Sequence, residues 1–245
     1  AIDIGNTNIV IGCCDDEKIY FVERLSTNNT KTELEYAISF KNVLELYGID
    51  PAQIKGGIIS SVVPPITNIV RASAEKVLGK SVKIVGPGVK TGMNILMDNP
   101  AQVGSDRIVN AVAAINEYPA PLVIIDMGTA TTFCVVDAKK NYIGGMILPG
   151  VRISLDALTA GTSQLSRISI EAPKKIIGKN TIDCMKSGII HGNAACIDGM
   201  VYRIERELGQ KTTVIATGGL AKRIVPYCEQ EIIVDDELLL KGLRL

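Results

Sequence analysis

Two short stretches, Asp3-Ile-Gly-Asn-Thr-Asn8 and Asp126-Met-Gly-Thr-Ala-Thr-Thr132, decide the fold expected for this chain of 245 residues. Each stretch follows or ends an apolar run and leads into another, so each predicts a tight corner between two β-strands. Each combines a carboxylate, a glycine and hydroxyl or amide side chains. Their starts lie 123 residues apart, which is half of the chain. The sequence therefore predicts two similar α/β halves that each present one polar corner.

These corners have the composition of a phosphate site. Glycine lets a ligand approach the backbone closely, and main-chain N–H groups and side-chain hydroxyls donate hydrogen bonds to it. Carboxylates hold hydrated cations, so Asp3 and Asp126 are candidate Mg²⁺ ligands. The expected phosphate donors are Asn6, Thr7, Asn8, Thr129, Thr131 and Thr132. Either corner alone is explained by a plain β-turn, but the pair favours a nucleotide site in a cleft between two lobes.

Composition excludes several classes of partner. Lys plus Arg and Asp plus Glu both total 26, so the chain lacks the basic excess that nucleic acids or anionic membranes attract. The six cysteines form no CxxC pair and are expected to be reduced thiols. No apolar stretch approaches the roughly 20 residues that span a bilayer, and the sequence opens directly on the first motif. We therefore expect a cytoplasmic protein that binds neither membrane nor nucleic acid.

Hydrophobic periodicity predicts alternating strands and helices in both halves. The expected strands are residues 1–4, 9–14, 19–25, 57–63, 82–85, 122–126, 132–137, 142–148 and 213–216. The expected helices are residues 32–47, 66–78, 103–118, 151–158 and 181–208, the last one interrupted by its glycines. Pro119 and Pro121 separate the halves, so we expect lobes at residues 1–116 and 117–245.

Two further motifs each have two interpretations. Gly104-Ser-Asp-Arg107 opens a predicted helix, where Asp106 has a bland explanation as a charge favoured by the helix dipole. Alternatively, Asp106 takes a proton from an alcohol while Arg107 binds a substrate carboxylate. Thr217-Gly218-Gly219 follows a predicted strand and forms either a simple turn or a loop on which the adenosine of a nucleotide lies. The spacing alone leaves both pairs of interpretations open.

The motifs in their order resemble those of type III pantothenate kinases. They are DIGNTN at 3–8, SSVVPP at 60–65, DNPxxVGSDR at 98–107, DMGTATT at 126–132, GGxIxPG at 144–150, IGKNTxxxMKSG at 177–188 and TGGLA at 217–221. The resemblance spans essentially the whole chain. It implies an α/β fold of two ribonuclease-H-like lobes, as in the acetate and sugar kinase, Hsc70 and actin superfamily. It also implies a homodimer that phosphorylates pantothenate with ATP to 4′-phosphopantothenate, the first step of coenzyme A biosynthesis.

The resemblance further implies roles for individual residues. The ATP-binding residues would be Asp3, Ile4, Gly5, Asn6, Thr7, Asn8, Ile9, Val10, Thr129, Gly218 and Gly219. Asp106 would be the general base, and pantothenate would contact Met97, Gly104, Ser105, Asp106, Arg107 and Thr181. Asp126 would bind a monovalent cation, K⁺ or NH₄⁺, in place of the Mg²⁺ considered above, and Asp3 stays a candidate Mg²⁺ ligand.

Two departures from the family pattern fall among the expected pantothenate contacts. Met97 stands where the family usually has Tyr, which changes the expected pocket for the acceptor. Ser105 stands where Ala is usual, and we expect this change to matter little. One alternative function is therefore a kinase of the same superfamily for another small hydroxy acid or alcohol, which Met97 favours. A second is a non-catalytic regulatory relative, against which the intact Asp106 and the intact corners argue.

Overall fold

The chain, described over residues 1–86 and 89–245 of a computed structural model, forms two compact units. The first unit comprises residues 1–92, 99–113 and 239–245, and the second comprises residues 93–98 and 114–238. The lobes expected at residues 1–116 and 117–245 stay a prediction of the domain limits. The two units differ from a simple division of the chain into halves. Residues 93–98, from the first half of the sequence, group with the second unit, and residues 239–245, from the second half, group with the first unit.

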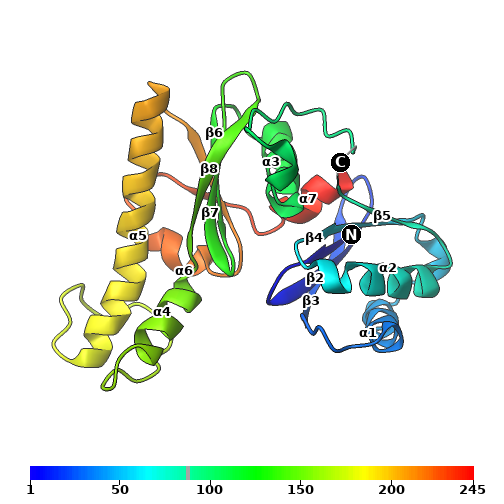
Figure 1. The fold of residues 1–245 in the computed structure, drawn as a ribbon, viewed down its shortest axis with the longest axis horizontal. Coiled ribbons are helices and arrows are strands. Elements are labelled where there is room, and N and C mark those ends of the chain that lie inside the picture. The colour runs from blue at the N-terminus through cyan, green and yellow to red at the C-terminus, as the bar shows by residue number, and fades with distance from the viewer. Residues whose placement is uncertain (87–88) are drawn as a thin grey trace. The chain divides into compact units, whose positions relative to one another are not determined.

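The first unit is built on a five-stranded mixed sheet (Figure 1). Its strands are β1 (Ile2–Ile4), β2 (Asn8–Cys14), β3 (Ile19–Ser26), β4 (Gly57–Ser61) and β5 (Val82–Ile84), in the order β3-β2-β1-β4-β5. The first three strands form an antiparallel meander, and β4 and β5 run parallel to β1. In this register Asp3 is paired with Val10 on one side and with Ser60 on the other. These three residues therefore share one face of the sheet.

Helices α1 (Glu33–Leu46) and α2 (Pro64–Leu78) cover the opposite face. Thr32 caps α1 in a capping box with Glu35, as its position before the helical pattern predicts. The helix expected from residue 66 begins instead at Pro64. Proline is tolerated in the first helical turn because the N–H groups there have no partner within the helix, so Pro64 starts α2 rather than separating it from β4. The 3₁₀ turn Pro51–Gln53 precedes β4.

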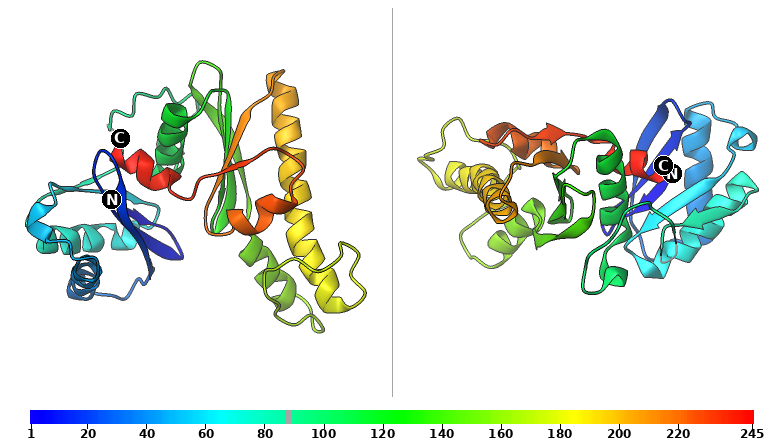
Figure 2. Two further views of the ribbon diagram at one scale, coloured as in Figure 1. Left: turned by 180° about the vertical axis from the view of Figure 1, so that it is seen from behind. Right: turned by 90° about the horizontal axis from the view of Figure 1, so that it is seen from above.

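The Asp3 face of the same sheet is covered by α3 (Ser105–Glu117) and α7 (Leu238–Arg244). Val109 of α3 and Leu243 of α7 pack around Val85, with Ile58 of β4 beside them. Gly12 of β2 lets α7 approach, since a Cβ there would lie 2.8 Å from the Leu240 side chain. Both views of Figure 2 show α7, in red, next to the blue strands of this unit. The sequence analysis did not predict α7.

The second unit repeats the sheet of the first. Its strands are β6 (Leu122–Met127), β7 (Ala130–Val136), β8 (Tyr142–Pro149), β9 (Thr213–Thr217) and β10 (Ile233–Val234), in the order β10-β9-β6-β7-β8. Again three strands form an antiparallel meander and two run parallel to the first of them. Counted from the first strand of each unit, the two strand orders are identical. The predicted α/β fold with two similar lobes is confirmed, whereas the active site between the lobes stays a prediction.

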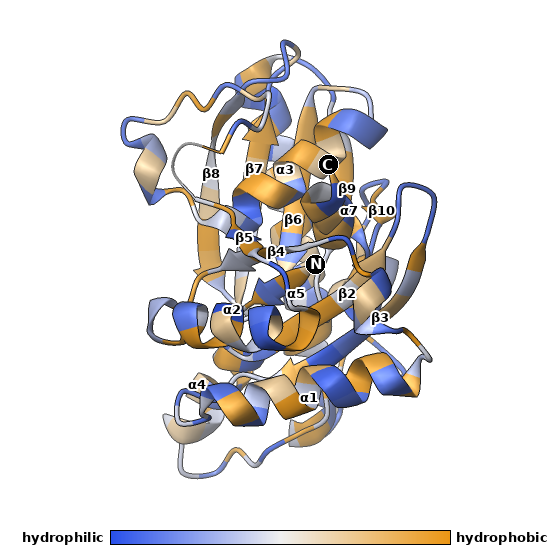
Figure 3. Cartoon of the chain, turned by 90° about the vertical axis from the view of Figure 1, so that its right-hand side faces the viewer, coloured by the Kyte–Doolittle hydropathy of each residue, from blue (hydrophilic) through white to orange (hydrophobic). Residues whose placement is uncertain are grey.

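Helices α4 (Val151–Ala160), α5 (Thr181–Leu208) and α6 (Ala221–Ile224) complete the second unit, together with a 3₁₀ turn at Val225–Tyr227. A further 3₁₀ turn, Pro100–Gln102, precedes α3 in the first unit. The expected interruption of α5 is wrong, because the helix is continuous over its 28 residues. Buried apolar residues at helical spacing, among them Ile190, Ala194, Ile197 and Val201, hold it on the sheet core, and Gly188 and Gly192 are exposed. Figure 3 shows the corresponding orange and blue bands along α1 and α2. No helix within the described residues is long and apolar enough to cross a membrane.

Candidate active site

The first polar corner is a tight turn between β1 and β2. The Gly5 N–H donates a hydrogen bond to the Asn8 carbonyl at 3.0 Å, and residues 6–8 are exposed at the tip. Thr27, just after β3, holds this turn from the side. Its hydroxyl donates to the Gly5 carbonyl at 2.6 Å and its N–H donates to the Thr7 carbonyl at 3.0 Å. Sequence reasoning missed Thr27, which lies outside the motif and reaches it only through strand pairing.

The residues on either side of this tip differ in what they offer a nucleotide. The side chains of Ile4 and Ile9 are completely buried in the core of the first unit. Only the backbone atoms of these two predicted ATP contacts are therefore placed to meet a ligand. Asp3 and Val10 are half-buried on the sheet face that α3 and α7 cover. The predicted ATP-binding stretch therefore has three parts: an exposed tip at residues 6–8, two isoleucines buried in the core, and the Asp3 carboxylate on the sheet face that α3 covers.

Asp106 lies in the first turn of α3 and is half-buried. Its Oδ1 atom accepts a hydrogen bond from the Arg107 N–H at 2.8 Å and lies over Gly104, where a Cβ would come within 2.5 Å of it. Burial raises the pKa of the Asp106 carboxyl, and the Arg107 N–H and guanidinium act in the opposite direction without cancelling the effect. A half-buried carboxyl with a raised pKa is suited to accept a proton. A fully solvated carboxylate at a helix end would not have its pKa raised by burial.

The second polar corner joins β6 to β7. The Gly128 N–H donates to the Ala130 carbonyl at 3.1 Å, and Gly128 and Thr129 are exposed. Gly150, at the start of α4, packs directly on this corner, since a Cβ there would lie 2.2 Å from the Thr129 carbonyl oxygen. Glycine is the only residue that leaves room for this approach.

Gly218 closes the same corner from the end of β9. It has φ of +93°, and a Cβ on it would lie 2.6 Å from Asp126 Oδ1. The structure therefore brings together Asp126, Thr129 and Gly218, three residues that the sequence placed in one site. Thr131 is different, because it shares the buried sheet face of Phe133 and the residue is only 6% exposed. Its hydroxyl has no hydrogen-bond partner within residues 1–86 and 89–245.

Two of the predicted pantothenate contacts, Met97 and Thr181, also belong to the second unit. Met97 follows a short stretch that pairs with Tyr142 of β8, and its sulfur lies 3.9 Å from where a Cβ on Gly144 would be. Thr181 is exposed and is the first residue of α5. Gly104, Ser105, Asp106 and Arg107, by contrast, all belong to the first unit.

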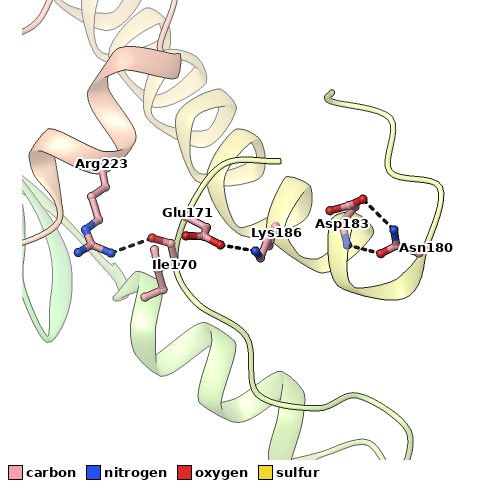
Figure 4. Close-up of polar contacts among 6 residues, drawn as sticks. All are labelled: Ile170, Glu171, Asn180, Asp183, Lys186 and Arg223. Carbon is pink, nitrogen blue, oxygen red and sulfur yellow. Dashed lines mark hydrogen bonds and ion pairs between the residues drawn. The ribbon is translucent and has the colours of Figure 1, made fainter. Parts of the chain in front are cut away.

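The segment that leads to Thr181 is fastened at several points (Figure 4). Arg223 of α6 donates a hydrogen bond to the Ile170 carbonyl at 2.9 Å, and Lys186 of α5 pairs with Glu171. Asn180 then caps α5, accepting from the Asp183 N–H at 2.9 Å and donating to the Asp183 carboxylate at 2.8 Å. These contacts fix where the first turn of α5 begins.

The metal-ligating groups of this structure fit a cation that is bound jointly by the protein and a ligand better than a cation bound by protein side chains alone. Among the described residues, no three His, Cys, Asp or Glu side chains converge on one point. Mg²⁺ in nucleotide enzymes is usually held by one or two carboxylates together with substrate phosphates, so the single carboxylate of Asp3 fits that ion. Asp126 offers hard oxygen donors beside the backbone of Met127 and Gly218, which fits a cation without demanding geometry.

Two units with the same strand order, each carrying a polar glycine corner at the end of its first strand, define the two-lobed fold of actin-like ATPases and sugar kinases. A conserved putative Baf family transcriptional activator from Campylobacter jejuni has this fold, with a TM-score of 0.59 and 18% identity over 99% of this chain and 94% of its own. An activator of 2-hydroxyisocaproyl-CoA dehydratase from Clostridium difficile, solved with bound ADPNP, has it as well, with a TM-score of 0.54 and 13% identity over 99% of this chain and 90% of its own.

The sequence specifies the family. The type III pantothenate kinase family profile matches residues 1–203. A type III pantothenate kinase of Halalkalibacterium halodurans is 47% identical over 245 residues, which cover all of this chain and 96% of the relative. The chain belongs to the type III pantothenate kinase family.

Proposed function

We propose that this chain transfers the γ-phosphate of ATP to the primary hydroxyl of pantothenate, which yields 4′-phosphopantothenate and ADP at the first step of coenzyme A biosynthesis. Family membership supports the substrate. One structural observation carries the mechanism: Asp106 is a half-buried carboxylate with a raised pKa, and its helix covers the sheet face on which Asp3 lies. The first unit therefore presents a proton acceptor and a phosphate corner on the same sheet.

The residues present can support each part of this transfer. The pantothenate hydroxyl oxygen attacks the γ-phosphorus, the bond from that phosphorus to the β,γ-bridging oxygen breaks, and ADP leaves with the electron pair. Asp106 accepts the hydroxyl proton, while Arg107 binds the carboxylate of pantothenate in the bidentate manner of guanidinium groups. The N–H groups and side chains of residues 5–8 hold ATP phosphates, and Thr129, Gly218 and Gly219 hold the nucleotide from the second unit. Most of the rate enhancement then comes from positioning and charge neutralisation.

Cations and a second subunit complete the proposal. Asp3 would hold Mg²⁺ and Asp126 would hold K⁺ or NH₄⁺, and both ions would supply positive charge against the phosphates. Neither ion has a role in proton transfer in this proposal, because Asp106 accepts the proton. The homodimer is also a proposal, and it rests on the resemblance of the sequence to its family. The cytoplasmic location is a proposal that rests on composition, because the six cysteines are expected to be reduced thiols.

The test is pantothenate-dependent release of ADP from Mg·ATP, run in parallel in K⁺ and Na⁺ buffers. We expect turnover that needs pantothenate and that is much faster in K⁺. Asp106→Asn should lower kcat by about a hundredfold or more, the usual contribution of a general base, and leave ATP binding intact. Asp50→Asn is a matched control, because Asp50 only caps a 3₁₀ turn of the same unit and Asn caps equally well. Near-normal turnover of Asp106→Asn would remove Asp106 from this role.

Met97 gives the second candidate function a specific basis, since this residue, whose sulfur lies beside Gly144 in the second unit, stands where the family resemblance implies a Tyr. A panel of hydroxy acids and sugars, compared with pantothenate at equal concentration, decides between the two acceptors. A higher kcat/KM on another acceptor would replace pantothenate. No turnover on any acceptor, together with tight binding to specific DNA, would instead favour a regulatory relative.

A further inference from the structure

Ser105, immediately before Asp106, is hydrogen-bonded to the end of β4. Its Oγ accepts from the Ser61 N–H at 3.0 Å and donates to the Ser61 carbonyl at 3.0 Å. The Ser60 hydroxyl, which is completely buried, lies 3.1 Å from the same oxygen. Since the one proton of Ser105 is used toward the Ser61 carbonyl, Ser60 is the donor of this third bond. One side chain thus joins two segments 45 residues apart.

The end of the sheet explains why a side chain is needed there. Along β4, the backbone groups of Ile58, Ser60 and Val62 point to β1, as the bond from Val62 N–H to the Ile4 carbonyl shows. Those of Ile59 and Ser61 point to β5, whose last contact is the bond from Val85 N–H to the Ile59 carbonyl at 2.7 Å. At Ser61 the neighbouring strand has ended. The Ser105 hydroxyl therefore satisfies both backbone groups that β5 no longer reaches.

This arrangement fixes the first turn of α3 relative to the sheet. Ser60 is paired in register with Asp3, so Ser105 joins the helix that carries Asp106 to the strand beside the carboxylate of the first corner. All of these residues belong to one unit. An Ala at position 105 would leave the Ser60 hydroxyl, the Ser61 N–H and the Ser61 carbonyl without these bonds, and buried polar groups avoid that state.

We propose that Ser105 is a positioning residue, which holds the Asp106 carboxylate in place by binding the end of β4, and that it is not a contact of pantothenate. The proposal rests on the proposed function of Asp106 as the base. It revises the expectation that the departure from Ala at this position matters little. Small displacements of a catalytic group lower the rate strongly, since about 1 Å of misplacement reduces turnover as much as a hundredfold.

The test separates positioning from stability and from substrate binding. Ser105→Ala should lower kcat by about ten- to a hundredfold and leave KM for ATP and for pantothenate within about twofold. Ser105→Thr keeps the hydroxyl and should restore most of kcat, and Ser60→Ala, which removes one bond of the three, should show a smaller loss. Ser73→Ala is the matched control. Ser73 of α2 is completely buried, and its hydroxyl lies 2.8 Å from the Glu33 carbonyl of α1 and 2.7 Å from the Ile69 carbonyl of α2, so this variant should lower thermal stability without lowering kcat.

A double variant connects Ser105 to Asp106 specifically. If Ser105 acts through the base, Ser105→Ala has no further effect on the residual rate of Asp106→Asn. Normal kcat in Ser105→Ala, with a large loss in Asp106→Asn, would overturn the positioning role and leave the proposed function standing. Normal kcat in both variants would overturn the base role of Asp106 and, with it, the positioning role of Ser105. A rise in KM for pantothenate at unchanged kcat would make Ser105 a substrate contact after all.

Discussion

Replacing Gly150 by Ala tests whether the second corner is as closely packed as its backbone indicates. The new Cβ would lie 2.2 Å from the Thr129 carbonyl oxygen and 2.7 Å from that of Gly128. Carbon and carbonyl oxygen normally approach no closer than about 3.3 Å, so the corner and the start of α4 would separate by roughly 1 Å. Because Gly150 has φ of −66° and ψ of 157°, an Ala is not strained there by its own backbone, and the close contact alone determines the effect.

Overpacking of this kind destabilises proteins by about 1–3 kcal/mol, and two rigid backbone oxygens favour the upper end of that range. A loss of about 3 kcal/mol lowers the melting temperature of a chain of this size by roughly 6–12 °C. Thermal unfolding followed by far-UV circular dichroism measures it, and titration with ATP should show weaker binding because Thr129 is displaced.

Gly188→Ala is the matched control for this substitution. Gly188 is an exposed position inside α5, and no atom lies within 4 Å of the point that a Cβ would occupy. Alanine in a helix interior is more favourable than glycine by about 0.5–1 kcal/mol, so this variant should be slightly more stable than the parent. The reasoning fails if Gly150→Ala unfolds at the same temperature as the parent protein and binds ATP equally well.

Three further predictions use the titration and hydrogen bonding of single side chains. The raised pKa of Asp106 means that the folded state binds this proton more tightly than the unfolded state, so the ionised carboxylate destabilises the fold. Asp106→Asn should therefore raise the melting temperature at pH 7, and the gain should vanish as the pH falls below 3.8, the ordinary value of the group; no gain at pH 7 would contradict this. Burial alone would raise the pKa of Glu205, but hydrogen bonds from Lys211 and Thr212 outweigh burial and lower this pKa below 4.5. The stability that the Glu205 carboxylate contributes is therefore present above pH 4.5 and is lost as the pH falls through the lowered pKa. Glu205→Gln should reduce stability at pH 7 and weaken its dependence on pH below 4.5 in denaturant titrations, and an unchanged pH dependence would exclude Glu205 as the source. Arg223→Ala should speed hydrogen exchange around Ile170 and leave the strand amides of the second unit protected, whereas uniform loss of protection would mean global destabilisation.

Local signals in the sequence were sufficient for the elements that depend on local interactions. Thr32 and Glu35 lie at the spacing of a capping box, and α1 begins directly after Thr32. The Asp, Gly and Thr pattern located both corners because a turn is determined by the few residues that form it. The duplication could be predicted for the same reason, since each corner marks the end of the first strand of a sheet.

Features that depend on distant contacts could not be predicted in this way. The sequence shows Ser105 only as a small residue at a helix start, and its bonds to Ser60 and Ser61 depend on where β5 ends. The low helix propensity of glycine predicted interruptions in α5. The helix is continuous because its apolar face packs on the sheet, and this tertiary contact outweighs local propensity. Gly150 is similar, since only the fold shows that it packs on the Thr129 backbone.

The position of α7 in the first unit has a consequence for synthesis of the protein. Residues 239–245 belong to the first unit, although they follow the whole of the second unit in the chain. Leu240 and Leu243 are buried there, and Gly242 packs so closely on α3 that a Cβ would lie 2.1 Å from the Val109 carbonyl oxygen. Domains generally fold in order from the N-terminus as a ribosome makes them. Here the first unit, whose sheet is made first, is completed only when α7 has been made, and a nascent chain that still lacks α7 exposes the part of the Asp3 sheet face that Leu240 and Leu243 cover.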